Sequence, residues 1–103
     1  MIKVYVIYPN NPGGTFDMTY YLSKHMPMVG EKLKPALKSM SVDHGLSGGQ
    51  PGTPAAYRVI ATLTFDSVET FERAFVPVAG EIQGDIPNYT NIVPTVQVSE
   101  VKL

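Results

Sequence analysis

His25 and Tyr21 are the two residues whose types and spacing best suit chemistry. They lie four positions apart, so one turn of a helix would place them on the same face. His25 is the polar member of an apolar stripe that would face the sheet, formed with Met18, Leu22, Val29 and Leu33. Because histidine titrates near neutral pH, such a residue could move a proton on an organic molecule bound in an apolar pocket. A buried histidine that only binds a backbone carbonyl is the alternative, and the residues leave both open.

The other titratable residues form weaker patterns. His44 precedes a glycine-rich loop, and two histidines without a suitably spaced carboxylate make a poor metal site, so we expect no metal. Asp43 and Asp85 fall near predicted loop edges, where aspartate favours turns. Tyr89 together with Pro87 could close over a pocket.

Length and composition narrow the classes of function. The 103 residues suit a single domain, 1–103, and the net charge of -1 lacks the basic surplus typical of nucleic-acid binding. The chain has no cysteine, which suits a reducing cytoplasm. The apolar start at 2–8 runs into a Pro/Asn/Gly segment at 9–14, too soon for a signal peptide or a membrane span. We therefore expect a cytoplasmic protein with no membrane partner.

Hydrophobic periodicity predicts the elements that must position these residues. Alternation of apolar and polar side chains predicts strands at 2–8, 36–44, 57–65 and 95–99. Helical periodicity from Asp17 to Leu33 and from Asp66 to Ile82 predicts two helices, each bent at a proline, Pro27 and Pro77. Asp17 or Thr15 could cap the first helix, and Asp66 with Glu69 resembles a capping box for the second. The order is βαββαβ, which indicates an α+β fold with a four-stranded antiparallel sheet.

Two helices can cover only one face of such a sheet. The opposite face would carry polar residues among a few apolar ones, namely Tyr5, Ile7, Ile60 and Val101. A second copy of the chain, packed sheet against sheet, would cover these apolar residues. We therefore expect a homodimer.

Separate motifs along the chain resemble the EthD family, whose members are named from ethyl tert-butyl ether degradation. The matching motifs are Tyr8-Pro9-Asn10, Phe16-Asp17-x-x-Tyr20-Tyr21-x-x-x-His25-Met26-Pro27, Gly45-Leu46-Ser47-Gly48-Gly49 with Pro51-Gly52-Thr53-Pro54, and Gly84-Asp85-Ile86-Pro87-Asn88-Tyr89-Thr90. The resemblance implies a ferredoxin-like protomer whose sheet packs against that of a second copy, a dimeric α+β barrel, with a cavity between sheet and helices in each protomer. It also implies a catalytic role for His25 and Tyr21, and ligand contacts from Tyr8, Met26, Asp85, Pro87 and Tyr89.

Function is less constrained than fold, because proteins with this fold catalyse unrelated reactions. One hypothesis is a cofactor-free enzyme of small-organic-compound catabolism, an oxidoreductase, isomerase or lyase, that binds a small apolar molecule. His25 would act as general acid/base and Tyr21 as its hydrogen-bond partner. The alternative is a noncatalytic binding or accessory protein of an oxidative degradation pathway. Haem binding through His25 or His44 is a third possibility, by analogy with other proteins of this fold.

Overall fold

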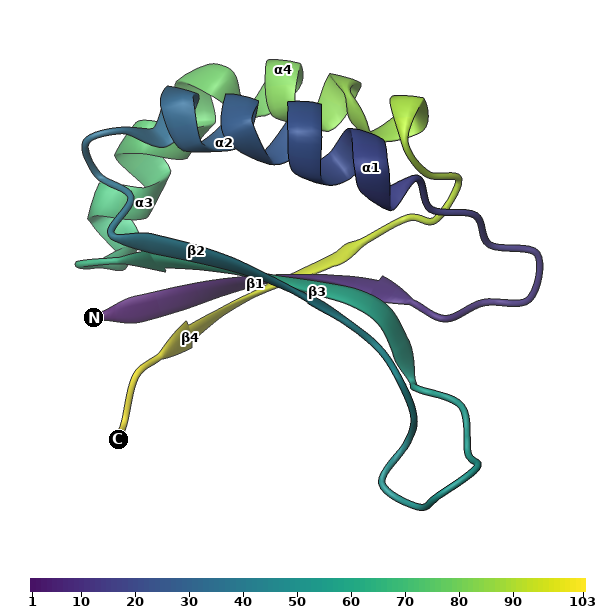
Figure 1. The fold of residues 1–103 in the computed structure, drawn as a ribbon. Helices are drawn as coiled ribbons and strands as arrows, with labels where there is room; N and C mark the ends of the chain where they lie inside the picture. Colours follow the sequence, from purple (N-terminus) through teal and green to yellow (C-terminus); the bar gives the residue numbers. More distant parts are fainter.

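The chain folds as a four-stranded antiparallel sheet with all of its helices on one face (Figure 1). The computed structural model describes residues 1–103. The strands, in the sheet order β2-β3-β1-β4, are β1 (Ile2–Pro9), β2 (Ser39–His44), β3 (Tyr57–Phe65) and β4 (Thr95–Glu100). The predicted βαββαβ order and antiparallel sheet are confirmed. None of the helices is both long and apolar enough to cross a membrane.

Strand register determines which side chains face the helices. Val4 of β1 lies opposite Leu63 of β3 and Val98 of β4, so these three share the helix-facing side. Tyr5 lies opposite Thr62, and both side chains are on the other face of the sheet, which no helix covers. Because side chains alternate along a strand, a shift of one residue would exchange the two faces, and the buried face fixes the register.

The first helical region runs from Met18 to Leu33 and contains a wide turn. Its parts are α1 (Met18–Tyr20), a π-helical segment (Tyr21–His25) and α2 (Met26–Leu33). Asp17 caps α1, because its side chain accepts a hydrogen bond from the backbone N–H of Tyr20. The expected irregularity at Pro27 takes the form of this π turn, in which the N–H of Met26 bonds to the carbonyl of Tyr21.

The π turn changes which residues face the sheet. Leu22, which the periodicity assigns to the inward stripe, is 52% exposed, so that prediction is wrong. A π turn holds one more residue than an α turn and therefore rotates the residues before it relative to those after it. Tyr21 takes the inward position instead and is buried together with His25 and Met26.

The second helical region is broken into short pieces. These are α3 (Val68–Phe75), a 3-10 turn (Val76–Val78), α4 (Ala79–Gly84) and a second 3-10 turn (Ile86–Asn88). The predicted break at Pro77 coincides with the first 3-10 turn, since proline lacks the N–H that an α-helix needs there. The N-cap is Ser67, whose hydroxyl accepts from the N–H of Thr70, and not the predicted Asp66.

The core consists of two apolar clusters that lie between the sheet and the helices. One contains Ile2, Val4, Val29, Leu33, Leu63, Phe65 and Ile82. The other contains Tyr8, Tyr21, Met26, Val59, Ala61, Tyr89 and Ile92. Both clusters contribute side chains to the wall of a single cavity, so the space between them is not filled by the protein itself.

Candidate functional site

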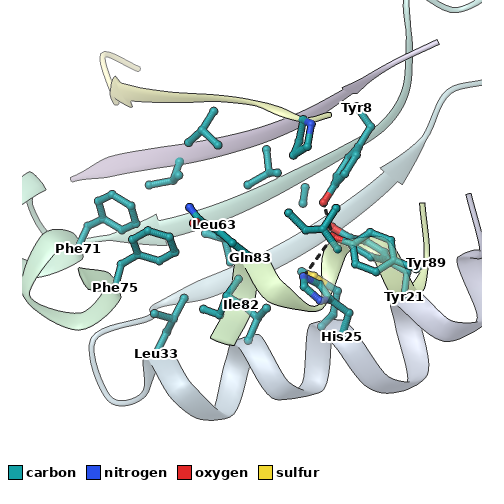
Figure 2. A pocket seen from close by; sticks show the side chains of 18 of the residues that line it. Tyr8, Tyr21, His25, Leu33, Leu63, Phe71, Phe75, Ile82, Gln83 and Tyr89 are labelled. Carbon is teal, nitrogen blue, oxygen red and sulfur yellow. Dashed lines mark hydrogen bonds between the residues drawn. The ribbon is translucent and has the colours of Figure 1, made fainter. Parts of the chain in front are cut away.

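A cavity of about 540 Å³ lies between the sheet and the helices. This volume falls in the range of about 300–1,000 Å³ that is usual for small-molecule sites. Of the twenty residues that line the cavity, sixteen are hydrophobic. Figure 2 shows Phe71 and Phe75 at one end of the cavity, and Tyr8, His25 and Tyr89 gathered at the other. The exposed side chains of Val76 and Val96 belong to the lining and mark its opening, between β4 and the end of α3.

His25 ends the π-helical segment and is 4% exposed, with its ring in the cavity wall. Its Nδ1 atom lies 2.9 Å from the Oδ2 atom of Asp85, which directly follows α4. Its Nε2 atom lies 3.4 Å from the hydroxyl oxygen of Tyr89. The imidazole is therefore held from both sides, by a carboxylate on one and by a phenol on the other.

Asp85 is the centre of a small hydrogen-bond network. Its Oδ1 atom accepts hydrogen bonds from the hydroxyl of Tyr20 at 2.7 Å and from the amide of Asn88 at 2.9 Å. Burial alone would raise the pKa of Asp85, but these hydrogen bonds and the contact with His25 outweigh it and lower that pKa. Because an ionised carboxylate can only accept, Nδ1 of His25 must carry a proton and donate it. In the neutral ring, the lone pair is then on Nε2.

Tyr8 and Tyr89 form a pair of buried hydroxyls whose oxygens lie 2.7 Å apart. Burial is the largest cause that raises the pKa of each phenol. Both side chains therefore stay protonated at neutral pH, and both can donate a hydrogen bond. The four residues form a continuous chain of contacts, from Asp85 through His25 and Tyr89 to Tyr8.

Tyr21 does not have the predicted hydrogen bond to His25. Their rings are nearly parallel, at 14°, with centroids 5.3 Å apart, so the phenol stacks on the imidazole. The two residues lie four positions apart in the π-helical segment, and both are buried on its inward side. Burial also raises the pKa of Tyr21, so a neutral ring packs against His25.

Main-chain contacts fix the position of Tyr89 against the first helical region. The N–H of Asp17 donates to the carbonyl oxygen of Tyr89 at 2.7 Å, and Phe16 forms an isolated β-bridge with Thr90. The hydroxyl of Thr90 also donates to the carbonyl of Thr15. The start of the first helical region and the end of the second are thus joined directly beside the site.

The predicted ligand contacts separate into two groups. Tyr8, Met26 and Tyr89 line the cavity together with the predicted catalytic residues, His25 and Tyr21. Asp85 and Pro87 do not line it. Asp85 instead supports His25, and Pro87 is exposed beside a separate surface depression.

His44 lies apart from the site, exposed at the end of β2. No group of three or more His, Cys, Asp or Glu side chains lies close enough together to hold a metal ion. His25 is a poor fit for a haem iron, because Asp85 and Tyr89 contact its two nitrogens and the ring is almost fully buried.

Tyr20 and Asn88 are site residues to which the sequence analysis assigned no role, although both lie in the motifs quoted there. Both act on Asp85, and neither lines the cavity. The available signal was their position beside predicted residues, since Tyr20 precedes Tyr21 and Asn88 precedes Tyr89. The pairing of Asp85 with His25 could not be read from spacing, because the two residues come from different helical regions.

Comparisons with known proteins identify the family. A model of the EthD domain matches residues 15–92. An EthD-like protein from Ralstonia eutropha has a similar crystal structure, with a TM-score of 0.94 and 43% sequence identity, over 99% of this chain and 92% of that one. A comparison with curated proteins found no match.

Two further solved structures share the fold at low sequence identity. One is an ethyl tert-butyl ether D (EthD) family protein from Bacillus halodurans, with a TM-score of 0.67, 16% identity, and coverage of 99% of both chains. The other is HapK from Hahella chejuensis, with a TM-score of 0.60, 12% identity, and coverage of 99% of this chain and 93% of that one. The family model and the 43% identical relative carry the assignment, and the chain belongs to the EthD family.

Proposed function

We propose that the protein binds a small apolar organic molecule in the cavity and transfers a proton on it through His25, without a cofactor. The observation that carries this proposal is the chain Asp85–His25–Tyr89 at the polar end of an otherwise apolar cavity. A titratable ring that an ionised carboxylate orients, beside a space of ligand size, is the arrangement that general acid/base catalysis requires.

Each residue of the chain has a distinct role in this proposal. His25 accepts the proton on Nε2, the nitrogen that Asp85 leaves unprotonated. Asp85 holds the ring in that tautomer and stabilises the imidazolium that forms. Because apolar side chains surround the ring, the attraction between the imidazolium and the carboxylate is stronger than it would be in water. Tyr21 stacks on the ring and limits its rotation.

A neutral bicyclic probe, 5-nitrobenzisoxazole, tests the proposed base directly. When a base removes its C–H proton, the five-membered ring opens to a coloured cyanophenolate, so absorbance reports proton abstraction without knowledge of the natural substrate. We expect the protein to accelerate this reaction beyond an equal concentration of free imidazole. His25→Gln should lower kcat/KM by about 10²-fold or more.

The exposed histidine supplies a matched control. His44→Gln removes the same group outside the cavity and should leave the rate unchanged. Equal rates for the wild-type protein and the His25→Gln variant would exclude His25 as the base. A circular dichroism spectrum of each variant separates loss of the base from loss of the fold.

A noncatalytic binding or accessory protein of an oxidative degradation pathway is the second candidate. One contact favours this candidate. The Tyr89 hydroxyl lies within hydrogen-bond distance of the Nε2 atom of His25, so the nitrogen that would act as the base already has a partner. If this is the function, apolar aromatic compounds such as naphthalene will bind with micromolar affinity. In that case 5-nitrobenzisoxazole will be bound without being converted.

The proposed setting is the breakdown of a small organic compound in the cytoplasm. The name of the Bacillus halodurans relative refers to ethyl tert-butyl ether, a small molecule of mainly apolar surface. A cavity with sixteen hydrophobic residues in its lining suits a compound of that kind. The chain has no cysteine, which suits a reducing compartment.

We also propose that two copies pair through the sheet face that the helices leave uncovered. Ile7 lies opposite Ile60 on this face, and Tyr5 lies beside them, opposite Thr62. All three are only partly buried in the single chain, and a second copy would cover them. Sedimentation analysis should give a dimer for the wild-type protein and a monomer for Ile60→Lys. A wild-type monomer at micromolar concentration would refute this pairing.

A further inference from the structure

The polar groups of the cavity wall restrict the charge of the molecule that it can hold. The lining contains no lysine and no arginine, and its one carboxylate, Glu72, is on the exposed side of α3. A carboxylate or phosphate in this cavity would lose its hydration and meet no lysine or arginine, and burial of a charge without such a partner is strongly unfavourable. The cavity therefore selects an uncharged molecule.

The buried hydrogen-bonding groups lie together at one end of the cavity, whereas the other polar residues of the lining, Glu72 and Gln83, are exposed. These are Nε2 of His25 and the phenols of Tyr8, Tyr21 and Tyr89 (Figure 2). The opposite end is formed by Phe71 and Phe75, whose rings stack on one another with centroids 5.3 Å apart. A matching molecule has a flat or bulky apolar body and a single polar group at one end.

The spacing at the polar end indicates what that group is. A proton acceptor, Nε2 of His25, and a hydrogen-bond donor, the hydroxyl of Tyr89, lie 3.4 Å apart in the same wall. In a ketone, the carbonyl oxygen and the α-carbon that carries the acidic proton are both bonded to the same carbonyl carbon. One donor and one base at this separation can therefore reach the two atoms at once.

We propose that the substrate is an uncharged, mainly apolar ketone, and that the site transfers its α-proton by enolisation. This proposal rests on the proposed function of His25 and adds the substrate class and the role of Tyr89. Tyr89 binds the carbonyl oxygen, and Tyr8 positions Tyr89 by donating to its hydroxyl oxygen. The Tyr89 hydrogen, which faces Nε2 of His25 in this structure, turns to the carbonyl oxygen when the substrate binds.

The proton and electrons balance within the site. Nε2 of His25 takes the α-proton, the C–H electron pair becomes the new C=C bond, and the carbonyl π pair moves to the oxygen. The resulting enolate oxygen accepts the hydrogen bond from Tyr89. The imidazolium then returns its proton to the same carbon, to a conjugated carbon or to the oxygen. No oxidant, reductant or added co-reactant is needed.

Exchange of α-protons in 2-tetralone tests the proposal. This neutral bicyclic ketone is incubated with the protein in D2O, and NMR follows the loss of its α-proton signals. We expect exchange faster than without protein, about 10²-fold slower with Tyr89→Phe, and abolished with His25→Gln. Tyr57→Phe removes a phenol on the exposed start of β3 and should exchange like the wild type. The exchange rate with Tyr8→Phe should lie between the rates with Tyr89→Phe and with the wild type.

A binding comparison tests the same contact without turnover. The compound 2-naphthol has the shape of the enol of 2-tetralone, and naphthalene lacks its hydroxyl. We expect 2-naphthol to bind about fivefold more tightly than naphthalene to the wild-type protein, because one hydrogen bond is worth about 1 kcal/mol. The two compounds should bind equally tightly to Tyr89→Phe.

The outcomes separate this inference from the proposed function. Elimination of 5-nitrobenzisoxazole without accelerated exchange in 2-tetralone would overturn the ketone substrate and leave His25 as a base. Exchange that is equally fast in folded Tyr89→Phe and in the wild type would overturn the role of Tyr89. Failure of both reactions would overturn the proposed function together with this inference.

Discussion

The Nδ1 atom of His25 lies 2.9 Å from the Oδ2 atom of Asp85, although 60 positions of sequence separate the two residues. His25 ends a π turn in the first helical region, and Asp85 follows the last turn of α4. The contact forms only when both helical regions pack against the sheet. The geometry of the site is therefore a property of the complete fold, and each half of the chain supplies one partner.

Replacing Asp85 with asparagine should impair catalysis more than binding. An amide can offer its N–H to Nδ1, which would favour the tautomer with the proton on Nε2 and leave no base facing the cavity. We expect kcat for 5-nitrobenzisoxazole to fall by about 10²-fold with little change in KM. Asp43→Asn, which alters an exposed residue of β2, is the matched control. Unchanged kcat in Asp85→Asn would rule out the orienting role of the carboxylate.

Asp85 should also contribute to stability in a way that depends on pH. Its pKa in the folded protein lies below the ordinary value of 3.8, so the unfolded chain binds protons more readily. The ionised carboxylate therefore contributes fully to the free energy of unfolding at pH values above the pKa of Asp85 in the unfolded chain. This contribution is lost as the pH falls through the lower pKa of Asp85 in the folded protein. Urea unfolding should show that the wild type is more stable than Asp85→Asn at pH 7. Below pH 3 that difference should be smaller, and a constant difference would contradict the assignment.

The hydrogen bond between Tyr8 and Tyr89 can be measured by a double-mutant cycle. Both residues are buried, and their oxygens are 2.7 Å apart. We expect a coupling free energy of about 1 kcal/mol between Tyr8→Phe and Tyr89→Phe in chemical unfolding. Additive effects of the two substitutions would show that the hydroxyls stabilise the fold independently.

A larger side chain at the cavity opening should slow ligand exchange without unfolding the protein. Val96 lines the opening and is 57% exposed, so a tryptophan there has room outside the core. Val96→Trp should reduce the association rate of 2-naphthol at least several-fold, measured by stopped-flow fluorescence. Val93→Trp places the same ring on a position that is 82% exposed and outside the lining, and it should bind like the wild type. Equal association rates in the two variants would place the opening elsewhere.

Much of the fold was predictable, because alternation and helical periodicity report which face of each element is buried. The strand at 57–65 was predicted to the residue, since apolar and polar side chains alternate there without interruption. The inward stripe of the first helix was predicted less well. Periodicity counts assume an α-helix throughout. Because Tyr21–His25 forms a π turn, Tyr21 and not Leu22 is buried against the sheet.

The site was predictable as a set of residues and not as a geometry. His25, Tyr8, Met26 and Tyr89 do lie together in one cavity wall. Spacing along a helix suggested that Tyr21 would be the hydrogen-bond partner of His25. Spacing cannot show that a carboxylate from another helical region, that of Asp85, binds the imidazole instead. Asp85 binds Nδ1 because the bridge between Phe16 and Thr90 brings the two helical regions together at that point.

Because the cavity between the two core clusters is not filled by the protein, a ligand bound there should raise the thermal stability of the fold. Cavity walls in an empty protein lose the dispersion contacts that a filled core would have, and a guest that binds only the folded chain restores them. A ligand at 100 times its Kd would stabilise the fold by about 2.7 kcal/mol. For a domain of this size that corresponds to a rise in Tm of roughly 10 °C or more. The melting temperature of this chain is therefore a direct readout for screening candidate metabolites.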